Sequence, residues 1–184
     1  GAMRLITLGE MAAAVSRSGA FGLIGASGME GGRLREEIRR ARSLTDKPFG
    51  VNIPIYRPNA SEALEIAIQE GVKTLTTSAG DPGKVIRRVK EAGMKILQVV
   101  ATVEMARKAE DAGVEGVIAV GTEGGGHVGR DEIATMVLTR QAVKAVKIPV
   151  VAAGGLGDGN GWVAAFALGA EGIQMGTRFL ATRE

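Results

Sequence analysis

The feature that most constrains this chain is a joint that recurs four times, in which a helical stretch ends at a glycine and a short apolar run follows at once. Glycine just past a helix adopts the left-handed conformation that other residues avoid. Two further apolar runs are entered through Pro48 and Pro149, and proline suits the first position of a strand. The four glycine joints are Gly71, Gly93, Gly113 and Gly169. Helices and strands are therefore predicted to alternate along the chain.

The apolar runs are short, and several are nearly continuous, as in Val117-Ile118-Ala119-Val120. Such runs are typical of strands covered on both faces, as in a parallel sheet. We expect strands near residues 21–26, 49–55, 74–79, 95–101, 116–120, 149–153 and 172–176. We expect helices near residues 9–18, 30–43, 60–70, 82–92, 103–112, 132–146 and 160–168. Start signals precede three of these helices, at Asp81, at Thr102, and at Asp158 or Asn160.

These steps of strand and helix, each of roughly 20 to 28 residues, match an α/β fold of the TIM-type (β/α)8 barrel, which has about 250 residues in all. The chain begins with a helix that no strand precedes, so strand 1 is expected to be lacking. An open, doubly wound sheet would obey the same alternation and is the alternative. Either architecture makes residues 1–184 a single domain.

The composition excludes several classes of function. With no cysteine and a single histidine, the chain has no disulfide framework, thiolate nucleophile or His-rich metal cluster. Its net charge of +3 comes from basic residues interleaved with acidic ones, as at 35–39, which are interpreted as solvated helix faces. Aromatic residues are only 3%, so nucleic-acid binding is not expected. No apolar run approaches the roughly 18 residues that span a bilayer, and no signal peptide is recognisable. We expect a cytoplasmic protein with a small-molecule substrate and no membrane partner.

The glycines that follow predicted strands cannot be explained as residues that end helices. In a parallel barrel the loops after the strands build the site, and those after strands 7 and 8 often hold a phosphate. Gly154-Gly155 and Gly176-Thr177 stand at these two places, where backbone N–H groups and a hydroxyl can cradle a dianion. The alternative is a pair of tight turns. The run from Gly154 to Gly159 has the wrong spacing for a dinucleotide fingerprint, and that interpretation is discarded.

A third glycine-rich loop, Gly124-Gly125-Gly126-His127, follows the strand that ends at Val120. A histidine among glycines at a strand's carboxyl end can approach a planar cofactor closely, and its usual pKa suits proton transfer near neutrality. His127 is therefore the candidate catalytic residue, against the alternative of a solvent-facing histidine. Glu123 is a competing carboxylate that is better interpreted as an exposed loop residue.

Four segments of the chain resemble the nitronate monooxygenase family, formerly called 2-nitropropane dioxygenases, and the related FMN-dependent enoyl-acyl-carrier-protein reductases. The segments are LGEMAAAVSRSGAFG (8–22), DKPFGVNI (46–53), GTEGGGHVG (121–129) and AAGGLGDGNGWVAAFALGAEGIQMGTRFLAT (152–182). The resemblance implies an oxidoreductase with FMN in the barrel mouth and with His127 at the position of the family's active-site histidine. The cofactor contacts that it implies are Met3, Asn52, Gly125, Gly154, Gly155, Gln174, Met175, Gly176 and Thr177.

The chain departs from the family in three places. Val120 stands where relatives commonly have Gln or Glu. Gly1-Ala2-Met3 resembles the family's turn after strand 1, but a remnant of an expression tag would give the same residues. The chain stops at Glu184, where relatives continue into a lid region, so it is interpreted as a possible fragment.

Two enzymatic functions follow from the resemblance. The first is a nitronate monooxygenase that oxidises alkyl nitronates with O₂, and the second is an NAD(P)H-dependent FMN-containing enoyl-acyl-carrier-protein reductase. The lack of strand 1 and of a lid region leaves a third alternative, a non-catalytic flavin-binding core fragment. Without strand 1, the strands near 21–27 and 172–175 would present unpaired edges. We expect these edges to close on each other, to be covered by a second copy in a homo-oligomer, or to be covered by residues outside this sequence, and we favour the last.

Overall fold

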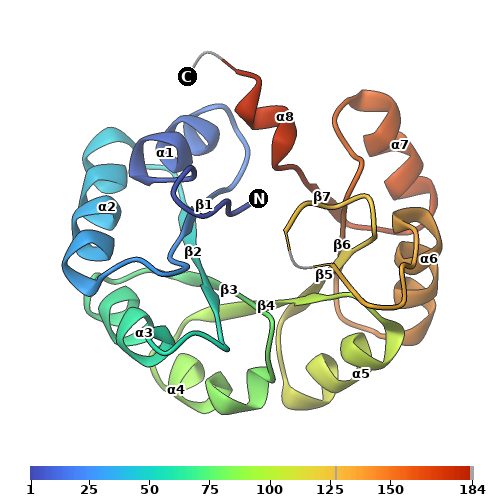
Figure 1. Ribbon diagram of the computed structural model, residues 1–184, viewed down its shortest axis with the longest axis horizontal. Coiled ribbons are helices and arrows are strands. Elements are labelled where there is room, and N and C mark those ends of the chain that lie inside the picture. The colour runs from blue at the N-terminus through green and yellow to red at the C-terminus, as the bar shows by residue number, and fades with distance from the viewer. Residues whose placement is uncertain (127, 183–184) are drawn as a thin grey trace. The chain divides into compact units, whose positions relative to one another are not determined.

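The computed structural model describes residues 1–126 and 128–182. Contacts between residues divide the chain into two compact units. Unit 1 comprises Gly1–Gly80 and Arg87–Ile96, and unit 2 comprises Asp81–Ile86 and the described residues from Leu97 onward. Helices and strands alternate in both units, as the sequence predicts (Figure 1).

Unit 1 is built on parallel strands that are neighbours in the order of the sequence. Gly22 of β1 lies opposite Phe49 of β2, and Val51 of β2 lies opposite Leu75 of β3. All residues of β1 and all but the first of β2 are buried, as expected of strands covered on both faces. The elements of this unit are α1 (Gly9–Arg17), β1 (Gly22–Gly25), α2 (Gly31–Leu44), β2 (Phe49–Pro54), α3 (Ala60–Gln69), β3 (Thr74–Ser78) and most of α4 (Ile86–Glu91).

Unit 2 repeats this arrangement. Leu97 of β4 lies opposite Gly116 of β5, Val117 of β5 opposite Val150 of β6, and Val151 of β6 opposite Gly172 of β7. Besides the short 3₁₀ helix η1 (Pro82–Lys84), its elements are β4 (Lys95–Val100, from Leu97), α5 (Val103–Ala112), β5 (Gly116–Val120), α6 (Thr135–Ala145), β6 (Val150–Ala153), α7 (Gly159–Ala167), β7 (Gly172–Gln174) and α8 (Thr177–Leu180).

The helices identify the class of fold. Consecutive helices contact each other, α1 with α2 and α2 with α3 in unit 1, and α5 with α6 in unit 2. A doubly wound sheet would place helices on both faces, whereas within each unit the helices follow one another along one side of the strands (Figure 1). The TIM-type (β/α) barrel class is confirmed, and the described residues contain its strands from the second onward. The segment 4–7, the candidate for a first strand, forms a turn.

Glycine and capping signals explain where most helices begin and end. The four predicted glycine joints all have positive φ, between 65° at Gly93 and 96° at Gly169. The side chains of Asp81, Thr102 and Asp158 each accept a backbone N–H at the start of the next helix. The choice between Asp158 and Asn160 is thereby settled in favour of Asp158.

Arginines of α2 hold α3 through one carboxylate. Glu70 accepts hydrogen bonds from Nη1 of Arg35 at 2.6 Å and from Nη2 of Arg39 at 2.9 Å, and Arg42 donates to its backbone carbonyl. The Glu70 side chain is only 7% exposed. Arg39 is solvated, with a side chain 63% exposed, so the interpretation of 35–39 as a solvated helix face needs correction only at Arg35, whose side chain is 33% exposed and reaches an acceptor that follows α3. Among the described residues, no helix is long and apolar enough to cross a membrane.

Candidate active site

The two glycine loops predicted to hold a phosphate leave neighbouring strands at the same level. Ala153, the last residue of β6, lies opposite Gln174, the last residue of β7. The loops that begin at Gly154 and Met175 therefore start side by side. They remain close further on, because a Cβ built on Gly157 would stand 4.0 Å from Cβ of Arg178 in α8.

The first of these loops needs glycine for two separate reasons. Gly154 and Gly155 have φ of 108° and 66°, which L side chains rarely adopt. A Cβ on Gly154 would also lie 2.6 Å from Oγ1 of Thr135 and 2.9 Å from the backbone nitrogen of Gly124. The backbone is thus turned and closely packed at the place where phosphate binding is predicted, and such a turn can present N–H groups to an anion.

The second loop leads into a short helix. Gly176 precedes α8, of which Thr177 is the first residue and is exposed. Gln174 and Met175 are half-buried beside it. The hydroxyl of Thr177 and the backbone around Gly176 are the polar groups that this loop could offer to a ligand.

The third loop, after β5, is exposed at Gly125 and Gly126. A Cβ on Gly125 or Gly126 would meet no atom within 4 Å, so a ligand could approach the backbone there. Gly124 is crowded instead, because a Cβ there would lie 2.7 Å from Cγ1 of Val120, the residue that departs from the family pattern. His127 lies outside the described residues, and its role stays a prediction.

Glu123 is an exposed loop residue, as interpreted from the sequence, but its carboxylate also accepts two hydrogen bonds. Its Oε2 accepts hydrogen bonds from the backbone nitrogen and from Oγ1 of Thr135, both at 2.8 Å. Burial raises the pKa of Glu123, but hydrogen bonds from its own backbone N–H and from Thr135 lower it by more, so that the pKa lies below its usual value. The residue is exposed, but its carboxylate is an ionised acceptor at the start of α6.

Two predicted cofactor contacts lie in unit 1, around the end of β1. Asn52 is buried on β2 opposite Gly25, and its Nδ2 donates to Oγ1 of Thr76 at 2.9 Å. Met3 also lies close to Gly25, since a Cβ on this glycine would stand 3.1 Å from the Met3 carbonyl. The backbone nitrogen of Gly25 donates to the carbonyl of Thr7 at 3.0 Å, so the N-terminal turn covers part of the β1 edge. Whether Met3 and Asn52 contact a cofactor stays a prediction.

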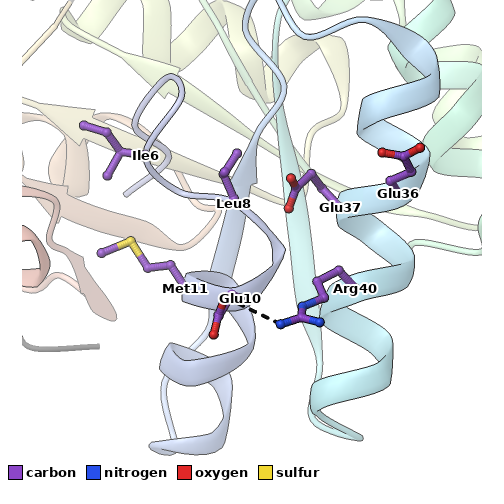
Figure 2. Close-up of a pocket in the computed structure, with 7 residues that line it drawn as sticks. All are labelled: Ile6, Leu8, Glu10, Met11, Glu36, Glu37 and Arg40. Atoms are coloured by element: carbon purple, nitrogen blue, oxygen red, sulfur yellow. Dashed lines mark ion pairs between the residues drawn. The ribbon is translucent and has the colours of Figure 1, made fainter.

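A separate hollow in unit 1 includes none of the predicted site residues. Figure 2 shows its lining, which comes from the N-terminal segment, α1 and α2. Oppositely charged side chains face each other there, and Glu10 pairs with Arg40 at 3.7 Å. The lining residues are Ile6, Leu8, Glu10, Met11, Glu36, Glu37 and Arg40. Because Glu10 and Arg40 pair with each other and Glu37 accepts from the backbone nitrogen of Gly9, this hollow is a weak candidate for catalysis.

Comparisons with known proteins agree along the whole chain. The family model described as nitronate monooxygenase matches residues 1–184. A curated relative from Rhodococcus jostii (strain RHA1), (3aS,4S,5R,7aS)-5-hydroxy-7a-methyl-1-oxo-octahydro-1H-indene-4-carboxyl-CoA dehydrogenase, is 38% identical over 95% of this chain and 49% of its own length. A probable nitronate monooxygenase from Staphylococcus saprophyticus subsp. saprophyticus is 36% identical over 97% of this chain and 63% of its own.

A solved structure is closer still. FabK from Thermotoga maritima is 48% identical, with a TM-score of 0.96 over 100% of this chain and 58% of its own. The chain thus spans about half the length of the first curated relative that it matches, and under two thirds of the others.

Proposed function

The chain belongs to the nitronate monooxygenase family, and from this premise we propose that it is the FMN-binding core of an oxidoreductase that oxidises alkyl nitronates with O₂. The observation that carries the proposal is the pair of glycine loops that leave β6 and β7 side by side. A glycine turn closely packed by its neighbours, beside a second loop with a hydroxyl, suits the phosphate of a mononucleotide.

The residues of unit 2 fit this cofactor. The turn at Gly154 and Gly155 has the left-handed backbone and the lack of side chains that let a phosphate meet N–H groups directly. Gly176 and Thr177 add backbone groups and a hydroxyl from the neighbouring loop. FMN, when bound, supplies the oxidation and reduction chemistry that no side chain of this chain can supply.

The chain's own part in the reaction is to place groups. The open space at Gly125 and Gly126 leaves room for a flat ring against the backbone. His127 is proposed to hold or accept a proton at an imidazole nitrogen while the substrate is oxidised. This role rests on its place in the family motif, since the residue lies outside those that the structure describes.

A second function has specific support. The relatives from Rhodococcus jostii and Mycobacterium tuberculosis, 38% and 37% identical, are both named as dehydrogenases of a CoA thioester. An NAD(P)H-dependent FMN-containing enoyl reductase acting on thioesters is therefore the second candidate. The two functions differ in whether a nicotinamide reduces the flavin.

The experiment has two steps. The purified protein is mixed with FMN and separated from free cofactor, and we expect a yellow protein. A colourless protein that takes up no FMN would mean an inert core fragment. The yellow protein is then given an alkyl nitronate with O₂, and separately NADH and NADPH without oxygen. Turnover of the nitronate with no bleaching by either nicotinamide supports the first function. Rapid bleaching, with reduction of an enoyl thioester and no nitronate turnover, would replace it with the second.

A further inference from the structure

An acidic residue lies beside the turn that is proposed to hold a phosphate. A Cβ on Gly155 would lie 3.2 Å from Cβ of Glu123, so the acidic residue flanks the turn proposed to hold a phosphate dianion. A negative charge near this turn would repel a phosphate, and the repulsion would weaken anion binding. The position of Glu123 therefore needs a reason strong enough to outweigh this cost.

The geometry of its carboxylate supplies the reason. Helix α6 begins at Thr135, and the preceding residue, Ala134, has no side-chain oxygen with which to cap it. Oε2 of Glu123 takes that place by accepting from the backbone nitrogen and from the hydroxyl of Thr135. A carboxylate at the first turn of a helix also interacts favourably with the helix dipole, so part of its charge is compensated.

The same threonine connects the cap to the phosphate turn. Its Oγ1 lies 3.2 Å from the carbonyl of Ala153, the residue just before Gly154. A Cβ on Gly154 would collide with this Oγ1 and with the backbone nitrogen of Gly124, which follows Glu123 in sequence. The loop after β5, the start of α6 and the turn after β6 are thus in direct contact.

From these contacts we propose that Glu123 is a positioning residue, whose carboxylate fastens the β5–α6 loop to the start of α6 and so holds the Gly154–Gly155 turn in its phosphate-binding conformation. The inference rests on the proposed function, because the phosphate is that of FMN. It assigns to Glu123 no contact with substrate or cofactor.

Repulsion and positioning predict opposite results, which makes the test sharp. FMN affinity is measured by quenching of flavin fluorescence for the wild type, Glu123→Ala and Glu123→Gln. If the residue acts only through its charge, both variants bind FMN more tightly. If it holds the turn, Glu123→Ala binds FMN about tenfold more weakly, as expected for loss of a cap. Glu123→Gln, which keeps an acceptor oxygen, then recovers most of the affinity.

A second pair of variants leaves the charge unchanged. Thr135→Val removes the hydroxyl that Glu123 accepts from, and Thr135→Ser keeps it. Positioning predicts weaker FMN binding for the valine variant and near-normal binding for the serine variant. Equal binding by both would overturn the proposal, even where Glu123→Ala fails to fold. Glu171→Ala is the control, since it removes one exposed negative charge just before β7 in the same unit.

A measurement without flavin separates this inference from the proposed function. In the cofactor-free protein, Glu123→Ala should raise the hydrogen-exchange rate of the Gly154 and Gly155 amides relative to the wild type, while Glu171→Ala should not. If the wild type binds no FMN but this difference appears, the proposed function fails and the positioning role stands. If the wild type binds FMN, and Glu123→Ala changes neither the amide exchange rates nor the FMN affinity, the positioning role fails and the proposed function stands.

Discussion

The two units use their acidic side chains differently. In unit 1, carboxylates pair with arginines to fasten one helix to the next, as Glu70 does with Arg35 and Arg39. In unit 2, Glu110 accepts from the backbone nitrogens of Lys147 and Ile148, and Glu123 accepts from that of Thr135. Charges in unit 1 therefore secure the framework, whereas these two in unit 2 fix the paths of loops. Glu37 of unit 1 is an exception, since it accepts from the backbone nitrogen of Gly9.

The glycines of the two units differ in a related way. Gly71 in unit 1 and Gly155 in unit 2 have nearly the same φ, 67° and 66°. Around Gly71 a Cβ would meet nothing within 4 Å, whereas at Gly155 it would meet Glu123. One glycine serves only to end a helix, and the other belongs to a crowded turn with a proposed ligand. A positive φ thus ends a helix at Gly71 and belongs to the proposed phosphate turn at Gly155.

The substitutions Gly155→Asn and Gly71→Asn test this comparison, and their difference in FMN affinity is the largest effect that we expect. Asparagine tolerates the left-handed backbone, so strain stays small in both variants. Gly155→Asn pushes a side chain against Glu123, displaces the turn from its proposed phosphate-binding conformation, and should weaken FMN binding on the order of 100-fold, the equivalent of losing one strong hydrogen bond to a charged group. Gly71→Asn should leave FMN affinity unchanged. Equal affinities measured by equilibrium titration would show that the phosphate lies elsewhere.

The next effect concerns stability and unit 1. Glu70→Ala leaves three arginines around an empty acceptor site, and we expect it to lower the free energy of unfolding by about 2 kcal/mol. The arginines keep access to water, which is why the loss stays below that of a fully enclosed pair. Urea denaturation measures it. FMN affinity, measured on the folded variant, should stay unchanged, and a parallel loss of affinity would contradict the division of roles between the units.

The same carboxylate gives a smaller, pH-dependent effect. Hydrogen bonds from Arg39 and Arg35 outweigh burial and hold the pKa of Glu70 below its usual value. A lowered pKa in the folded state means that ionised Glu70 contributes stability above its unfolded pKa of about 4.3, and that this contribution disappears as the pH falls through the folded pKa. The stability difference between the wild type and Glu70→Gln should therefore be full at neutral pH and shrink below about pH 4. A difference independent of pH would mean that packing, not charge, is responsible.

The smallest effect is expected at an exposed pair. Glu65 accepts from both Nε and Nη2 of Arg88 at 2.7 Å, but the two side chains are 44% and 45% exposed. Water screens such a pair, so Glu65→Gln should shift Tm by no more than about 2 °C. Glu36→Gln, which removes an exposed negative charge on α2, is the control for calorimetry. A much larger shift for Glu65 would place it with Glu70 as part of the framework.

Local signals made most of the fold predictable from the sequence. The glycine joints and the caps at Asp81, Thr102 and Asp158 act within a few residues, so they can be recognised without knowing the fold. One local feature was not predicted: the stretch expected to form a single helix over 82–92 forms the 3₁₀ helix η1 and then α4, with a break between them. The short helix α8 was not predicted either, since Gly176 provides no side-chain cap.

The less predictable features depend on residues distant in sequence. The helix expected from residue 132 begins at Thr135, and the carboxylate that caps it comes from Glu123, twelve residues earlier. Glu70 likewise meets Arg35 across 35 positions. The residues around Glu123 and Glu70 give no local signal of these partners. The sequence therefore suggests only an exposed loop residue at Glu123 and does not distinguish Glu70 at all. Met3, Asn52 and the residues of the three loops stay predictions as cofactor contacts.

The side-by-side start of the loops after β6 and β7 has a thermodynamic consequence. A ligand that takes hydrogen bonds from both loops binds only a chain in which Ala153 and Gln174 are paired, and so not the unfolded chain. Mass action then makes cofactor supply part of the folding equilibrium: free ligand at 100 times its Kd would add about 2.7 kcal/mol to stability. In a cell short of that ligand, a larger share of this protein would stand open to proteases, and its abundance would follow the supply of its cofactor.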